Sequence, residues 1–249
     1  MSTIRIGTVD LPQKGGWDGY FKRLDYLELS GLFTAPVKPG TLARWASSAP
    51  AGSLGLVAPW VTTHREAPTR VQASWTADAG SGEFRDSPAV RVAVDALAQA
   101  ATTVAAPVVM FQSPPMLSPS ASNRDRLRAF FAEVAPAERF GGARRVWVPS
   151  GLWTPLTAVT FAGELGVVCT VDPLLDDPDL PLERMVALPA ESLYLRPLGM
   201  GRAGALSADR LDTLAEIADA YADVIVAFAT AQRFRDATSF AKLMRVDAN

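Results

Sequence analysis

The chain has 249 residues, of which 49% are hydrophobic and 20% charged, a balance typical of a globular protein with a large core. Its 24 basic and 26 acidic side chains give a formal charge of −2. With no basic run, the sequence lacks the electrostatic footprint of a nucleic-acid-binding segment, although a patch assembled in three dimensions stays open. The single cysteine, Cys169, excludes an intrachain disulfide and any metal site built from several cysteines.

Eight short apolar runs predict eight strands, and most of these runs are apolar on both faces, as in a parallel sheet covered by helices. They span residues 4–9, 26–30, 54–59, 106–112, 144–149, 166–171, 192–196 and 223–228. Helical patterns lie between them at 39–48, 88–101, 127–134, 155–163, 207–221 and 235–244, with only short turns of helix expected at 19–24 and 180–188. This alternation predicts an α/β protein, a single (β/α)8 TIM-type barrel domain over residues 1–249. The alternative is a doubly wound open sheet.

Helix start signals support this assignment at two places. Ser87 followed by Pro88 provides a cap and a first-turn proline. Ser207 stands where it can cap the helix that carries Leu211 and Leu214.

Two predicted loops are longer than α/β connections usually are. They cover residues 62–87, after the third strand, and 172–191, after the sixth. Both leave the carboxyl ends of strands, the face where barrel enzymes build their sites. The loops therefore form lids over a site or are disordered insertions.

Several of these strand ends carry a family pattern. RIGTVD (5–10), YLELSGLF (26–33), LGLVAPWVTTH (54–64), APVVMFQSPP (106–115) and SLYLRPLG (192–199) occur in this order. They resemble the motifs of the YecE-like TIM-barrel family, domain of unknown function 72, whose members carry F-x-V-K-A-P-x-x-I-T-H, G-x-V-L-F-Q-L-P-P and Y-V-R-L-H-G. The resemblance implies a TIM-type barrel but no reaction, because the activity of the family itself is not established.

The chain departs from that pattern at polar positions. Val57 stands for the family lysine, Pro197 for a histidine, and Trp147 begins a run in which the family's glutamate, arginine and histidine are absent. Ser30 and Leu32 replace an asparagine and a threonine, and Ala229 and Thr230 replace paired asparagines. The pattern residues that persist include Glu28, Pro59, His64, Gln112, Pro114, Pro115, Asp172 and Arg196. The resemblance therefore implies a divergent member.

Glu28 and Arg196 are the most informative of these residues. A carboxylate in the apolar run YLELS needs a partner or a shifted pKa. Arg196, also at a strand end, is the natural partner across the barrel mouth. The pair is either structural, or Glu28 serves as a general base or a cation anchor.

Arg196 alternatively holds a carboxylate or phosphate, because its guanidinium binds either one through two hydrogen bonds. The glycine-rich segment that follows contains Arg202 and leads into the helix after Ser207. Backbone amides at a helix start favour anions, and the loop after the seventh strand is a frequent phosphate position in barrels. The alternative is an ordinary flexible loop.

Other strand-end residues have two interpretations each. Asp172 takes part in proton transfer or caps the Asp-Pro turn. Gln112 orients a ligand or satisfies the loop backbone. Trp60, Trp147 and Trp153 form an aromatic wall for a ligand or fill the space left by lost charges. His64, the only histidine, is a catalytic base or a hydrogen-bonded anchor of its loop.

Three functions follow from these residues. The first is a non-catalytic or degenerate barrel that binds a small anionic ligand or a partner protein at the carboxyl-end face. The alternative is an enzyme acting on a small phosphorylated or carboxylated substrate, with Arg196 as anion anchor and Glu28, Asp172 or His64 as catalytic residues. A nucleic-acid-processing barrel is disfavoured by the acidic balance.

Cofactors, metals and location complete the sequence predictions. No spacing demands a metal site, no serine has the context of a nucleophile elbow, and no cofactor is identified. No apolar run approaches the ~18 residues of a membrane span, and the first residues lack a signal-peptide core. We therefore expect a soluble, cytoplasmic protein without a membrane partner.

Overall fold

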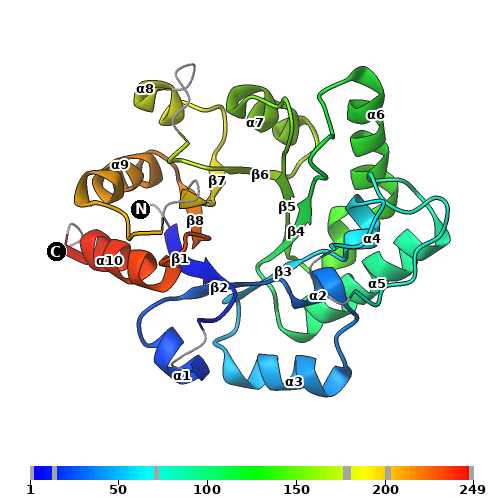
Figure 1. The fold of residues 1–249 in the computed structure, drawn as a ribbon, viewed down its shortest axis with the longest axis horizontal. Helices are drawn as coiled ribbons and strands as arrows, with labels where there is room; N and C mark the ends of the chain where they lie inside the picture. Colours follow the sequence, from blue (N-terminus) through cyan, green and yellow to red (C-terminus); the bar gives the residue numbers. More distant parts are fainter. Residues whose placement is uncertain (1–2, 13–15, 70–72, 176–180, 200–202, 247–249) are drawn as a thin grey trace.

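The computed structural model describes residues 3–12, 16–69, 73–175, 181–199 and 203–246. Eight parallel strands close into a barrel in sequence order, with β8 pairing back onto β1 (Figure 1). The strands are β1 (Thr3–Val9), β2 (Tyr26–Leu29), β3 (Leu54–Val57), β4 (Val108–Gln112), β5 (Arg144–Val148), β6 (Val168–Val171), β7 (Ser192–Leu195) and β8 (Asp223–Phe228). All eight predicted strands are confirmed, and closure of the sheet excludes the open-sheet alternative.

Helices surround the barrel on its outside (Figure 1). They are α1 (Gly16–Phe21), α2 (Gly31–Thr34), α3 (Pro39–Ser48), α4 (Trp60–Thr63), α5 (Pro88–Thr103), α6 (Ala121–Ala129), α7 (Pro155–Glu164), α8 (Leu182–Met185), α9 (Ala208–Asp219) and α10 (Arg233–Val246). A π-helical turn, η1 (Phe130–Val134), continues α6, and a 3₁₀ turn, η2 (Ala137–Phe140), precedes β5. The chain is therefore a single-domain (β/α)8 TIM-type barrel. Among the described residues, no helix combines the length and apolarity needed to cross a membrane.

The helix starts follow the predicted signals in part. The Ser87 side chain accepts a hydrogen bond from the Val90 amide (3.3 Å), and Pro88 opens α5. Ser207 precedes α9, but its side chain makes no cap bond there. The short helices α2 and α4 were not predicted, because four residues carry no helical periodicity.

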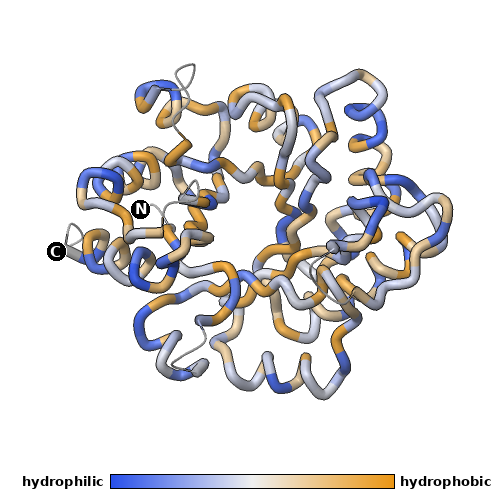
Figure 2. The backbone as a smooth tube through the Cα atoms, in the orientation of Figure 1, coloured by the Kyte–Doolittle hydropathy of each residue, from blue (hydrophilic) through white to orange (hydrophobic). Residues whose placement is uncertain are grey.

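The core has two layers. The larger lies between strands and helices, and the smaller fills the barrel with inward side chains: Tyr26, Val57, Val108, Met110, Val146, Tyr194, Ile225 and Ala227. Figure 2 shows the strands around the centre mostly in hydrophobic colours and the outer helices with hydrophilic stretches. Gly55 makes room for Tyr26, since a Cβ there would lie 1.8 Å from the Tyr26 hydroxyl oxygen. Side-chain alternation along each strand therefore decides which residues reach the barrel interior.

The long loop after β3 is packed against the barrel over the residues described. The amides of Gly82 and Glu83 donate to the carbonyls of Val61 (2.7 Å) and Thr63 (2.8 Å). Phe84 is 1% exposed and meets the rings of Phe130 and Phe131. Glu83 and Phe84 both have positive φ (52° and 57°), a strained conformation that this packing supports.

Candidate functional site

An ion pair lies inside the barrel, near the carboxyl ends of its strands. Glu28 of β2 is fully buried, and its Oε1 accepts a hydrogen bond from Arg196 Nη2 at 2.8 Å. The Tyr194 hydroxyl donates to Glu28 Oε2 at 2.6 Å and lies 3.1 Å from the hydroxyl of Tyr26. These four residues come from only two strands, β2 and β7, or from the residue directly after β7. Arg196 is therefore the partner of Glu28, as the sequence predicts.

Burial and charge both act on this cluster. Burial raises the pKa of Tyr26 and of Tyr194, and the neighbouring Glu28 charge raises both further, so the phenols stay protonated. Burial opposes the charge of Arg196, but the Glu28 carboxylate together with the side chains of Tyr194 and Tyr26 outweighs it, and the pKa of Arg196 is raised. Arg196 is therefore a cation held in a largely desolvated place.

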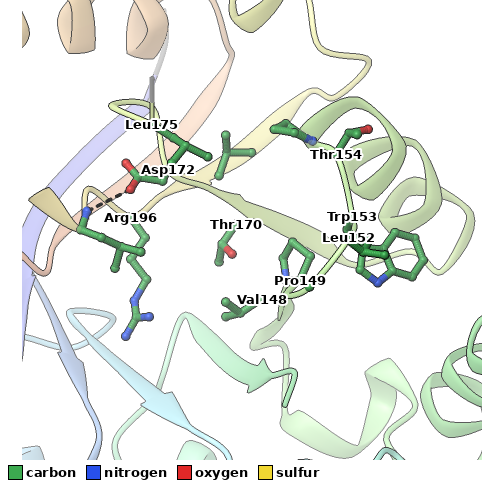
Figure 3. A pocket seen from close by; sticks show the side chains of 13 residues that line it. Val148, Pro149, Leu152, Trp153, Thr154, Thr170, Asp172, Leu175 and Arg196 are labelled. Atoms are coloured by element: carbon green, nitrogen blue, oxygen red, sulfur yellow. Dashed lines mark hydrogen bonds between the residues drawn. The ribbon is translucent and has the colours of Figure 1, made fainter. Parts of the chain in front are cut away.

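A cleft of about 480 Å³ opens beside Arg196 at the carboxyl ends of β5, β6 and β7. We call it the β5–β7 cleft; its described lining is residues 148–149, 151–155, 170–172, 175, 196 and 198. Figure 3 shows Arg196 and Asp172 on one side, with Pro149, Leu152 and Trp153 on the other. Its volume lies within the range of small-molecule sites.

Arg196 faces this cleft with unused hydrogen-bonding capacity. Its side chain is 15% exposed, and its buried Nε has no hydrogen-bond partner among the described residues. A guanidinium has five N–H donors, and within the described residues the Arg196 side chain donates one hydrogen bond, to Glu28. A buried donor without a partner is costly, so an acceptor placed in the cleft would be stabilising.

Asp172 lies on the cleft wall but is also bound to the backbone. Its Oδ1 accepts from the Leu174 amide (3.0 Å), and its Oδ2 accepts from the Leu198 amide (3.3 Å; Figure 3). Burial raises the pKa of Asp172, while these backbone bonds act in the opposite direction. The residue thus joins the loops after β6 and β7 and presents a carboxyl group to the cleft.

The other predicted site residues lie elsewhere. Gln112 ends β4 and is not among the described residues that line the cleft. His64 ends α4, where its Nδ1 lies 2.8 Å from Thr63 Oγ1 and its ring meets Phe33 edge-on. Burial lowers the pKa of His64. Arg202 lies outside the described residues.

Neither Trp60 nor Trp147 is among the described residues that line the cleft, which is at odds with the aromatic-wall alternative but not with the space-filling one. Trp147 points to the helix side of β5, is fully buried, meets Trp153 and Phe161, and donates from Nε1 to Ser113 Oγ (2.8 Å). Trp60 starts α4 and packs with Val61 and Ala93. The tryptophan on the cleft is Trp153, 8% exposed.

Sequence reasoning missed most of the cleft wall. Val148 and Thr170 share the inward parity of their strands, which is a usable signal, whereas Leu152 and Leu198 belong to turns and carry none. Within the described ranges, no three His, Cys, Asp or Glu side chains converge in a way that could hold a metal ion. The site that the chain does show consists of one arginine, carboxyl groups and apolar walls.

Fold and site together define a TIM-type barrel with a small cleft at the carboxyl ends of its strands. No protein-family model matches the sequence, and no match was found among curated proteins. The structure is similar to a DUF72 family protein from Enterococcus faecalis V583 (TM-score 0.64, 13% identity, covering 100% of this chain and 98% of that one). It is also similar to a DUF72 family protein from Thermotoga maritima MSB8 (0.64, 14%, 98% and 99%).

A third similar structure is the AP endonuclease, family 2, from Brucella melitensis (TM-score 0.54, 12% identity, covering 98% of this chain and 99% of that one). At these identities each likeness concerns the fold. The chain has a DUF72-like TIM-barrel fold, as the strand-end motifs predict.

Proposed function

We propose that this protein is a small-ligand-binding barrel whose ligand places a negatively charged or strongly accepting group on Arg196. The observation that carries this proposal is Arg196, a largely buried cation that lines an open cleft and whose Nε has no hydrogen-bond partner among the described residues. A ligand acceptor there would satisfy a donor that the described part of the protein does not.

The walls indicate what the rest of the ligand is like. Pro149, Leu152 and Trp153 lie on the opposite side of the cleft from Arg196 (Figure 3). Apolar walls with a few polar groups that fix orientation are typical of small-molecule sites. We therefore infer a ligand with an apolar body and one polar head group.

Two observations favour binding without catalysis. Glu28 is fully buried, engaged by Arg196 and Tyr194, and not among the described residues that line the cleft, so a ligand in the cleft is not placed to give it a proton. Both oxygens of Asp172 accept backbone amides. A general base must come within hydrogen-bonding reach of the proton it removes.

An enzyme acting on a small carboxylated or phosphorylated substrate is the second candidate, and one observation favours it. Asp172 lines the cleft, and burial raises its pKa in the direction expected of a proton-transfer group. In that case Arg196 would anchor the substrate and Asp172 would move the proton.

Titration calorimetry and ligand-observed NMR with phenylacetate test the proposal. Phenylacetate joins an apolar ring to a carboxylate; phenylacetamide is the uncharged control. We expect the wild type to bind phenylacetate more tightly than the amide, and Arg196→Met to lose that preference. Arg91→Met, an exposed arginine paired with Asp86, is the matched control and should bind as the wild type does.

A second variant covers the case in which Arg196→Met is too unstable to assay. Leu152 is 80% exposed and lines the cleft, so Leu152→Glu should leave the fold intact and weaken phenylacetate by charge repulsion. Absence of binding to the wild type, or equal affinity in wild type, Arg196→Met and Leu152→Glu, would overturn the proposal.

A further inference from the structure

We infer that the β5–β7 cleft selects head groups with a single negative charge, such as a carboxylate, over doubly charged phosphates, and that Glu28 sets this selectivity. The inference rests on the proposed function, because it assigns the ligand class of that same site.

The charges around Arg196 already balance. Glu28, 2.8 Å from Arg196 Nη2 and fully buried, cancels the cation on the barrel side. Asp172 is the other ionisable residue among the described residues that line the cleft. Arg210 donates to the Leu174 carbonyl (3.3 Å), and its charge acts on Asp172 and offsets that carboxylate. The described lining therefore offers no surplus of positive charge, whereas phosphate sites typically gather arginines or backbone amides.

The arrangement also fixes which face of the guanidinium meets a ligand. Tyr194 donates to Glu28 Oε2 at 2.6 Å, which holds the carboxylate so that its Oε1 engages Arg196 Nη2. Arg196 Nε has no partner among the described residues, so the guanidinium keeps donor capacity for another acceptor. One planar carboxylate suits an edge of a guanidinium, which is a fork of parallel N–H groups.

A second negative charge on the ligand adds little binding free energy in the β5–β7 cleft. Its attraction to Arg196 is opposed by repulsion from Glu28 and Asp172. The cost of removing the head group from water rises steeply with its charge. Glu28 is thus a positioning and specificity-determining residue that acts through Arg196.

The experiment compares phenylacetate with phenyl phosphate by titration calorimetry at pH 8, above the second ionisation of the phosphate at about pH 6. We expect the wild type to prefer phenylacetate by about tenfold or more. Glu28→Gln removes the charge and keeps an oxygen for Arg196, so the preference should move toward phenyl phosphate by about tenfold. Asp223→Asn, a matched change at the other end of the barrel, should keep the wild-type ranking.

The possible outcomes distinguish failure of this inference from failure of the proposed function. Equal or tighter binding of phenyl phosphate by the wild type overturns the inference and leaves the ligand site standing. An unchanged ranking in folded Glu28→Gln overturns the role of Glu28. If Glu28→Gln does not fold, the decision falls to two other results: the ranking of the two ligands by the wild type and their ranking by Asp172→Asn. Asp172 is part-exposed, and its substitution should also move the preference toward phenyl phosphate. Binding of neither compound overturns the proposed function and the inference with it.

Discussion

The two ends of the barrel hold the same kind of ion pair in different surroundings. At the amino end, Arg144 of β5 and Asp223 of β8 meet across the barrel, with side chains 34% and 33% exposed. At the carboxyl end, Arg196 and Glu28 meet with side chains 15% and 1% exposed. All four residues have the inward parity of their strands, since they alternate with residues that face the helices.

The difference is one of solvation. The amino-end pair keeps water on both partners, so its charges are screened and neither depends strongly on the other. The carboxyl-end pair has lost most of its water, so each charge needs its partner. Arg196 also borders a cleft, whereas Arg144 and Asp223 are not among the described residues that line it. The desolvated pair is therefore the one poised to respond to a ligand.

Arg196→Met should have the largest effect on stability. It leaves the Glu28 charge buried without its cationic partner, a change that typically costs about 3–5 kcal/mol. Urea unfolding followed by circular dichroism at pH 7.5 measures the loss. A loss below about 1 kcal/mol would show that water reaches Glu28, and the contrast between the two ends would fail.

Arg144→Met is the matched change at the amino end and should cost no more than about 1 kcal/mol, because both partners are about a third exposed. The same urea experiment, repeated in 1 M salt, should show the difference from the wild type shrinking as screening increases. If Arg144→Met destabilises as much as Arg196→Met, solvation is not what separates the two pairs.

Much of the fold was predictable because the barrel repeats one signal. Runs such as 223–228 are apolar on both faces, and the structure forms β8 over the same residues. The pattern at Leu127, Phe130, Phe131 and Val134 gave four buried side chains although the last turn is π-helical. The helices α2 and α4 were not predicted, because a single helical turn contains no repeat of apolar residues to detect.

The site was predictable only where one strand constrains the side chain. Glu28 in an apolar strand required a partner, and Arg196 at another strand end provided it. For Trp147 the sequence left two interpretations open, and strand alternation decides between them: β5 places Val146 and Val148 inward, so Trp147 faces the helices and fills space there. The wall at Leu152 and Trp153 lies in a turn, whose path no periodicity specifies.

Protonation of His64 should have the smallest effect on stability. Burial lowers the pKa of His64, so the folded protein resists protonation there while the unfolded chain takes up a proton below its usual value of about 6.5. Stability from this group is present above that pH and is lost as pH falls through the folded pKa.

The measurement is simple because His64 is the only histidine. Its imidazole proton signal in the NMR spectrum should titrate below pH 6.5 in the folded state. From pH 7.5 to 5.5 the wild type should lose stability to urea relative to His64→Asn, whose amide can replace the Nδ1 contact to Thr63 Oγ1. A midpoint at or above 6.5, or parallel losses in both proteins, would mean that the ring is solvated like an ordinary surface histidine. Because the wild type, Arg196→Met and Arg144→Met all carry His64, its contribution cancels when their stabilities are compared at one pH.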